Sequence, residues 1–233
     1  MEQLTLYGPP RLERPHPAKW SKPLLIALQS IVPPGLVVDP FGGVGSLALL
    51  GPRWRVLCGD LEPEWIGQAW KYGATGLRWD ATRLPLASGS VPAVITSPAY
   101  GNRLADAYEF DGSKASDSVR RSYRGHLQRD LSAGSGAGLQ WGPEYRDLHR
   151  RSLAEFRRVL APGGLLVINM KDHPRNGAIQ KVCDWWAAAM ADAGFRVSER
   201  IKVALKGDQN TARERAAGRP VVDHEELIVA ERP

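Results

Sequence analysis

Residues 36–46 read LVVDPFGGVGS, an apolar run that leads directly into a glycine-rich turn. The first four residues suit a buried strand that closes at Asp39, because β-branched and aliphatic side chains favour strands. Gly43 and Gly45 then allow the backbone to turn sharply and to approach a ligand without a Cβ clash. With Ala48 they also fit the dinucleotide pattern G-x-G-x-x-A, so this stretch alone leaves open a nicotinamide cofactor or another adenosine-bearing one.

Apolar runs and helical periods alternate along the rest of the chain. Two late apolar runs, separated by a polar insert, predict an antiparallel pair of strands at one edge of a sheet. The order as a whole predicts an α/β fold, with a mostly parallel sheet and helices on both faces. We expect strands at 54–60, 77–79, 91–97, 165–170, 195–205 and 224–231, and helices at 21–32, 62–73, 143–160 and 179–194.

The composition is that of an ordinary globular protein, with 233 residues, 43% of them hydrophobic and 24% charged. No apolar run approaches the roughly 18 residues that a membrane span needs, and the N-terminal stretch lacks the apolar core of a secretory signal. Cys58 and Cys183 lie far apart in apolar surroundings, which favours a reducing compartment over a disulfide framework. We therefore expect a cytoplasmic protein without membrane contact.

The net charge of +6 is compatible with nucleic-acid binding, although its distribution matters more than its sum. Residues 120–129 read RRSYRGHLQR, a segment with four arginines and no acidic residue, with Tyr123 and His126 among them. The alternative interpretation of this segment is a basic face exposed to solvent.

Two acidic residues follow expected strands at the same edge of the sheet. Asp60 ends the strand at 54–60, where a carboxylate can hydrogen-bond a ribose diol. Asp80 follows the next strand beside Trp79 and could accept a hydrogen bond from an adenine amino group. Each acid could instead be a helix N-cap or part of a surface loop.

Residues 96–103 read TSPAYGNR, directly after the apolar run VPAVI. The Ser97 hydroxyl and the Pro98 carbonyl could both accept hydrogen bonds from one exocyclic amino group, while the Tyr100 ring stacks on the base. Two acceptors aimed at one amino group would favour its attack on an electrophile. The alternative is a plain strand-ending turn, for which Ser-Pro is common.

Taken together, these stretches resemble the S-adenosylmethionine-dependent amino-methyltransferases of DNA. DPFGGVGS resembles their D-P-F-x-G-x-G-[ST] cofactor motif, and TSPAY resembles their [DNS]-P-P-Y catalytic motif. HPAKWSKP, APGGLLVINMKDHPRNG and VDHEELIVAE resemble the flanking segments, so the likeness spans 16–231 with a gap over 104–142. The resemblance implies a Rossmann-like methyltransferase fold with a mostly parallel seven-stranded sheet, in one domain over 1–233.

The resemblance also implies the site residues. The catalytic positions are Ser97, Pro98 and Tyr100. The S-adenosylmethionine positions are His16, Lys19, Asp39, Phe41, Gly43, Gly45, Asp60, Trp79 and Asp80. Ala99 stands where the family usually has a second proline, which leaves the state of the site in question. Serine at the first motif position leans toward cytosine N4 over adenine N6.

The implied reaction is direct methyl transfer to the amino nitrogen of a flipped base in DNA, without a covalent enzyme intermediate or a metal ion. DNA methylation in a restriction–modification system is the context that the resemblance suggests. We expect 104–142 to be a target-recognition insert, with a homodimer or a separate recognition partner as further sources of specificity. The expected phosphate contacts are Arg103, Arg120, Arg121, Arg124 and Arg129.

Two rival functions stay open. One is a methyltransferase acting on RNA, for instance on a guanine exocyclic amino group, where similar motifs occur. The other is a nucleic-acid-binding protein whose catalytic site was weakened at Ala99. A nicotinamide dehydrogenase is disfavoured, because Asp-Pro-Phe separates the strand from the glycines.

Overall fold

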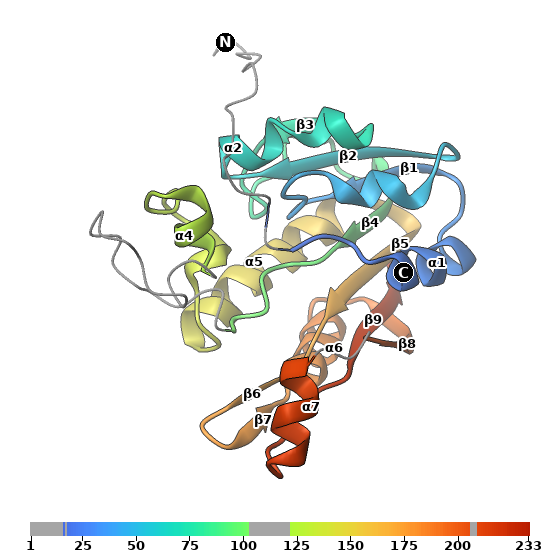
Figure 1. The fold of residues 1–233 in the computed structure, drawn as a ribbon. Coiled ribbons are helices and arrows are strands. Elements are labelled where there is room, and N and C mark those ends of the chain that lie inside the picture. The colour runs from blue at the N-terminus through green and yellow to red at the C-terminus, as the bar shows by residue number, and fades with distance from the viewer. Residues whose placement is uncertain (1–15, 17, 103–121, 206–208) are drawn as a thin grey trace.

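The structure is a computed structural model that describes residues 16, 18–102, 122–205 and 209–233. Arg103, Arg120 and Arg121 lie outside the described residues. The described residues form a seven-stranded sheet in the order β3-β2-β1-β4-β5-β9-β8 (Figure 1). Its strands are β1 (Gly35–Asp39), β2 (Trp54–Asp60), β3 (Thr75–Arg78), β4 (Val91–Thr96), β5 (Leu160–Met170), β8 (Arg196–Ala204) and β9 (His224–Glu231).

The sheet is parallel from β3 through β5, and β9 is antiparallel to both of its neighbours, β5 and β8. The predicted mostly parallel sheet with an antiparallel pair at one edge is therefore confirmed. The order of the strands reverses beside β1, whose neighbours are β2 and β4. In open α/β sheets, ligands bind outside the carboxyl ends of the strands at such a reversal.

Helices cover both faces of the sheet, as the sequence predicts. One face packs on α5 (Pro143–Val159) and α6 (Val182–Asp192), and the other on α1 (Lys22–Ile31) and the 3-10 helix η1 (Ser46–Leu50). Consecutive strand residues face opposite cores: Val94 belongs to the α5/α6 side and Ile95 to the α1/η1 side. The central strands are buried on both faces, which explains their continuous apolar runs.

Several elements differ from the prediction, and β5 begins five residues earlier than the expected strand at 165–170. The expected helix at 62–73 is broken into α2 (Pro63–Ile66) and the 3-10 helix η2 (Ala69–Tyr72), with Gly67 closing the first turn. A hairpin of β6 (His173–Arg175) and β7 (Ala178–Gln180) is present, and its Asn-Gly turn has positive φ at both residues. The polar insert after β8 contains α7 (Gln209–Ala216).

The segment that follows the undescribed residues 103–121 carries α4 (Tyr123–Leu127) and the 3-10 helix η4 (Gly136–Gly138). In Figure 1, α4 lies beside α5, away from the β8 edge of the sheet. None of the described helices has the length and apolar character needed to cross a membrane.

Candidate functional site

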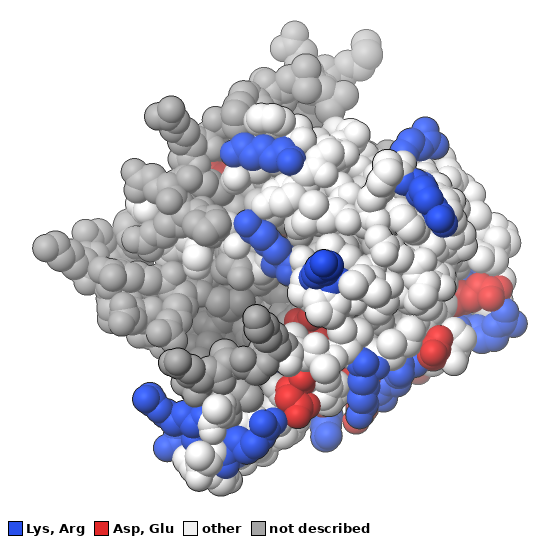
Figure 2. All heavy atoms as spheres, turned by 45° about the vertical axis from the view of Figure 1, so that its right-hand side comes forward, with Lys and Arg blue, Asp and Glu red and all other residues white. Residues whose placement is uncertain are grey.

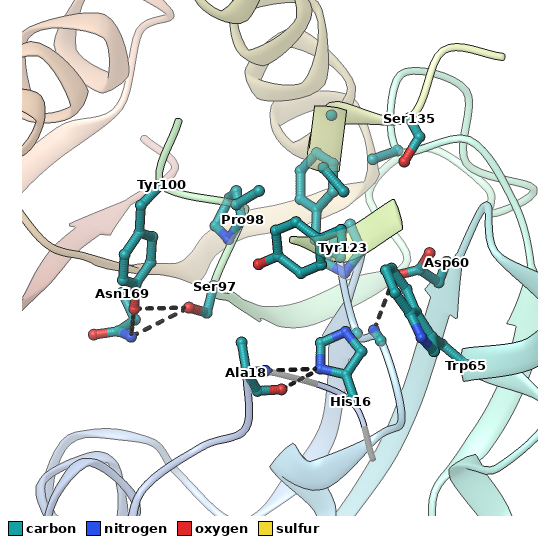
Figure 3. A pocket seen from close by; sticks show the side chains of 18 of the residues that line it. His16, Ala18, Asp60, Trp65, Ser97, Pro98, Tyr100, Tyr123, Ser135 and Asn169 are labelled. Atoms are coloured by element: carbon teal, nitrogen blue, oxygen red, sulfur yellow. Dashed lines mark hydrogen bonds between the residues drawn. The ribbon is translucent and has the colours of Figure 1, made fainter. Parts of the chain in front are cut away.

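A cavity of about 410 Å³ lies outside the carboxyl ends of β1, β2 and β4 (Figure 3). Its volume falls in the range of roughly 300–1,000 Å³ that is usual for small-molecule sites. The glycine turn after β1 and Asp60 line one part, which we call the glycine-turn end. Ser97, Tyr100, Asn169 and Glu225 line the other, which we call the serine end.

The glycine turn requires glycine at the position that faces the cavity. Gly43 has φ +51°, and a Cβ there would lie 3.0 Å from Nε2 of His16. Its backbone N–H donates to Oδ2 of Asp60 at 3.1 Å, which ties the turn to the end of β2. Gly45 has φ +75° and packs against Ala69 and Ala74, away from the cavity. Gly45 thus shapes the turn, and Gly43 faces the cavity.

Asp60 is the acidic group at the glycine-turn end. Oδ1 accepts from the backbone N–H of Glu62 at 2.9 Å, and Oδ2 accepts from Gly43. Burial raises the pKa of Asp60 to about 7, against the lowering effect of those two hydrogen bonds. Each carboxylate oxygen can accept a second hydrogen bond, so the group retains capacity for ligand hydroxyls.

Asp39 does not face the cavity, contrary to the sequence prediction. It is 1% exposed, and its carboxylate accepts from the Thr96 hydroxyl at 2.6 Å and from the Trp20 indole at 3.5 Å. Thr96 in turn accepts from the backbone N–H of Phe41 at 3.1 Å. Burial raises the pKa of Asp39 to about 7. The Asp39 carboxylate therefore points into the core, where its bond to Thr96 helps to hold the start of the glycine turn against the end of β4.

The remaining predicted cofactor residues all line the cavity, namely His16, Lys19, Phe41, Trp79 and Asp80. The His16 ring lies edge-on to Trp65 at 4.5 Å, and burial lowers its pKa to about 4. Trp79 is largely a core residue: its indole donates to the Pro40 carbonyl and covers Gly59, where a Cβ would lie 1.9 Å from the ring. Asp80 is exposed and accepts from the amide and hydroxyl of Thr82, at 2.8 Å each.

Four side chains form a hydrogen-bond network at the serine end, three of which appear in Figure 3. The Asn169 amide donates to Ser97 Oγ at 3.2 Å and to the Tyr100 hydroxyl at 2.9 Å. The Tyr100 hydroxyl donates to Oε1 of Glu225 at 2.9 Å and lies 3.3 Å from Ser97 Oγ. The hydroxyl of Tyr100 is thus held by protein groups, at a residue that lines the cavity and also packs against the core on the α5/α6 side.

Asn169 and Glu225 are functional candidates that the sequence analysis missed. Each carried a signal: Asn169 is a polar residue near the end of the apolar run LLVINM, and Glu225 precedes the apolar run of β9. Their proximity to Ser97 depends on β5 lying between β4 and β9 in the sheet, which the order of strands along the chain does not reveal.

The turn between Ser97 and Tyr100 has a distinct packing environment. Pro98 is buried and lines the cavity. Ala99 packs against a small cluster around Trp65 and Tyr123. The small side chain at 99 therefore lies against the segment that covers the glycine-turn end.

That covering segment, which we call the strap, consists of residues 122–138. The Arg129 guanidinium pairs with Glu62 at 2.8 Å and with Glu64. Glu62 is fully buried and also accepts from the Ser132 backbone N–H at 2.9 Å. Tyr123 is 7% exposed, with its ring 5.5 Å from Trp65. These contacts hold the strap over the residues that follow β2.

The two predicted arginine contacts among the described residues, Arg124 and Arg129, lie in different surroundings. Arg129 is engaged by two glutamates, so its charge is matched within the protein, which disfavours a phosphate contact at this position. Arg124 borders an open groove beside the strap and lies 3.6 Å from Asp130, and its predicted phosphate contact stays a prediction. On the face shown in Figure 2, basic side chains are dispersed above and mixed with acidic ones along the lower edge.

His149 on α5 is a further cavity-lining residue that the sequence analysis did not single out. The Tyr145 carbonyl lies 2.7 Å from its Nδ1, which makes Nδ1 the protonated nitrogen and Nε2 an acceptor. Burial lowers the pKa of His149 to about 4, so the ring is neutral near pH 7. Nε2 is buried and has no partner among the described residues, and a ligand N–H could satisfy it.

Comparison with known proteins identifies the fold. No family model and no curated protein matches the sequence. A methyltransferase solved in complex with the Trm112 methyltransferase activator of Haloferax volcanii has a TM-score of 0.56 at 19% identity, covering 89% of this chain and 88% of that one. An S-adenosylmethionine-dependent methyltransferase from Aquifex aeolicus has a TM-score of 0.51 at 16% identity, covering 91% and 90%.

These likenesses confirm the predicted Rossmann-like methyltransferase fold. They do not extend to the reaction, because a [4+2]-cyclase, SpnF, is similar to the same degree, with a TM-score of 0.52 at 12% identity over 93% of this chain and 84% of its own. What the chain does must therefore be argued from its own cavity.

Proposed function

We propose that this chain is an S-adenosylmethionine-dependent methyltransferase that modifies an exocyclic amino group of a base in DNA, with cytosine N4 favoured over adenine N6. The observation that carries this proposal is the position of Ser97 and Pro98 in the same cavity as Gly43 and Asp60. One cavity thus contains acceptors suited to an amino group and a turn suited to a nucleoside cofactor.

The residues at the glycine-turn end fit S-adenosylmethionine. Asp60 has acceptor capacity for a ribose diol, and the bare backbone at Gly43 allows close approach. Phe41 and His149 line the cavity with rings 5.5 Å apart, and His149 offers an acceptor suited to an adenine N–H. When bound, the cofactor supplies a methyl group activated on a positively charged sulfur.

The serine end suits an amino group as the methyl acceptor. Ser97 Oγ accepts one hydrogen bond from Asn169 and keeps a lone pair for a substrate N–H. The Pro98 carbonyl offers the second acceptor of the predicted pair, and Pro98 is held by burial. Fixed acceptors of this kind stabilise the positive charge that develops on nitrogen, without reorganising during the reaction.

DNA is the substrate that the motif resemblance favours over RNA. A base in a duplex must be flipped out to reach an enclosed cavity. Phosphate contacts would then come from Arg120, Arg121 and Arg124, within the proposed recognition insert at 104–142, and from Arg103 directly before it. A second copy of the chain or a separate partner would complete recognition of the target sequence.

The test is transfer of a tritiated methyl group from S-adenosylmethionine to DNA, with tRNA assayed in parallel. Nucleoside mass spectrometry of the modified DNA then identifies the base, with N4-methylcytosine as the expected product. If the methyl group is transferred to tRNA and not to DNA, RNA is the substrate. If the protein binds nucleic acid but calorimetry detects no binding of S-adenosylmethionine, the chain is a nucleic-acid-binding protein and not an enzyme.

A further inference from the structure

The hydroxyl groups at the serine end form a hydrogen-bond chain with a defined direction. The single proton of the Tyr100 hydroxyl is donated to Oε1 of Glu225, at 2.9 Å. In the 3.3 Å contact between Ser97 and Tyr100, the Ser97 hydroxyl is therefore the donor. The chain runs from Ser97 through Tyr100 to the carboxylate of Glu225.

The Asn169 amide donates the remaining hydrogen bonds to the two hydroxyls of this chain. It donates to Ser97 Oγ at 3.2 Å and to the Tyr100 oxygen at 2.9 Å, so it holds both hydroxyls in position. With Ser97 and Asn169 both donating to it, the Tyr100 oxygen has no lone pair left for a ligand. Ser97 Oγ has one, and Ser97 lines the cavity.

We propose that Glu225 is the final acceptor of the proton that the substrate amino group loses on methylation, reached through Ser97 and Tyr100. This inference rests on the proposed function. As the N–CH3 bond forms, the C–S bond breaks and its electron pair stays on sulfur. The nitrogen proton passes to Ser97 Oγ, the Ser97 proton to the Tyr100 oxygen and the Tyr100 proton to Oε1 of Glu225. The carboxylate ends as a carboxylic acid, and both hydroxyls are restored.

The surroundings of Glu225 suit an acceptor that gains and later releases a proton. Burial raises its pKa, while the Tyr100 hydrogen bond, the charge of Lys171 and a hydrogen bond from the Asn169 amide lower it. Burial also raises the pKa of Tyr100 well above its usual value, so Tyr100 remains protonated and acts as a link.

The other ionisable residues near Glu225 on its own strand have partners of their own. On the same strand, His224 pairs with Asp223 at 3.2 Å and with Glu226 at 3.5 Å, and Glu226 pairs with Arg200. On β8, the register partner of Glu225 is the uncharged Val203. Lys171, which directly follows the neighbouring strand β5, is the basic residue whose charge lowers the pKa of Glu225.

A first experiment uses the protein without cofactor or substrate. The glutamate carboxyl carbons are labelled with 13C, the Glu225 signal is assigned by its loss in Glu225→Gln, and its titration is followed by NMR. In Tyr100→Phe, the pKa of Glu225 should rise, because the hydrogen bond that stabilises the carboxylate is gone. An unchanged titration would overturn the relay, since Tyr100 and Glu225 would then not be coupled.

A second experiment measures methyl transfer against pH in four variants. Glu225→Gln keeps an oxygen acceptor for Tyr100 but does not take up a proton, and Tyr100→Phe breaks the chain at its middle. Each should lower kcat by roughly 100-fold, and the double variant should be no slower than either single one, because all three lose the same step. The acidic limb of the kcat profile should disappear in Glu225→Gln and return in Glu225→Asp.

The matched control is Glu231→Gln on the same strand, whose carboxylate forms a surface pair with Arg196. Its kcat and pH profile should be those of the unmodified protein. Additive losses from Glu225→Gln and Tyr100→Phe, or a kcat that these changes leave intact, would overturn the relay while methyl transfer itself stands. Failure of the unmodified protein to transfer a methyl group would instead refute the proposed function, and the NMR titration would still test the coupling.

Discussion

The two ends of the cavity are built in different ways. The glycine-turn end is local: one turn after β1 supplies backbone groups, and Asp60 on the next strand receives the Gly43 N–H. The serine end consists of side chains from distant parts of the sequence, since Ser97 and Tyr100 follow β4 while Asn169 and Glu225 come from β5 and β9. A turn can be recognised in sequence, whereas the partners of a hydroxyl depend on strand order.

Substitutions at the two ends should also have different effects on methyl transfer and on cofactor binding. Changes at the serine end should lower the rate of methyl transfer and leave the affinity for S-adenosylmethionine unchanged. Changes at the glycine-turn end should lower that affinity and leave the transfer rate at saturating cofactor unchanged.

The largest expected effect is that of Ser97→Ala. Loss of the hydroxyl removes one acceptor for the amino group, so kcat should fall on the order of 10²- to 10³-fold. The dissociation constant of S-adenosylmethionine, measured by calorimetry, should stay within about twofold, since a hydroxyl lost at the far end leaves the glycine turn intact. Ser198→Ala, on strand β8, is the control. A parallel loss of affinity would mean that the two ends are not separable.

Arg129→Gln should loosen the strap and leave Glu62 buried without its charge partner. We expect the free energy of unfolding to fall by about 2–3 kcal/mol, less than for a fully buried pair because the Arg129 side chain is 34% exposed. Chemical denaturation measures this change, and Arg151→Gln, whose partner Asp147 is exposed, should cost under about 0.5 kcal/mol. Equal stabilities of the two variants would show that the strap is not held by this pair.

Asp60→Asn tests the glycine-turn end. Hydrogen bonds to a charged group contribute about 1.5–3 kcal/mol, so the affinity for S-adenosylmethionine should fall roughly 10- to 100-fold, with kcat at saturation retained. Asp80→Asn should have an effect of only a few fold, because Asp80 is exposed and already occupied by Thr82. A larger effect at Asp80 than at Asp60 would reverse the assignment of these two acids.

The smallest expected effect is a pH dependence of cofactor affinity. The pKa of Asp60 is raised to about 7 in the protein by burial, and ligand hydroxyls would favour its ionised form. Affinity should therefore rise about tenfold between pH 6 and 8, with proton release on binding. Calorimetry in buffers of different ionisation enthalpy measures both quantities. In Asp60→Asn the dependence should be absent, because Asp39, with a similar pKa, faces Thr96 and Trp20.

Much of the fold could be predicted from sequence because the central strands are buried on both faces. Their apolar runs, such as VPAVI before Ser97, end where parallel strands deliver polar residues to one edge of the sheet. The apolar spacing at 62–73 predicted one helix, but the structure has two short ones. Gly67 ends α2, and Ala69 of η2 packs against Gly45, a tertiary contact that the spacing does not show.

The candidate site was predictable where the contacts are local in sequence. The core-facing position of Asp39 was not predictable from the motif, because a carboxylate at the end of a strand can face the ligand or the core, and its bond to Thr96 of β4 holds it in the core. Arg129 belonged to a basic segment, but its partners Glu62 and Glu64 are more than sixty residues away. The local sequence does not show which side chains will meet through tertiary packing.

The most direct test of a single cavity with two ends is a crystal structure of the protein with bound S-adenosylhomocysteine. The account predicts ribose hydroxyls at the Asp60 carboxylate, the adenine beside Phe41 and the sulfur directed toward Ser97 and Pro98. A ligand bound outside this cavity, or one whose sulfur points away from Ser97, would contradict it.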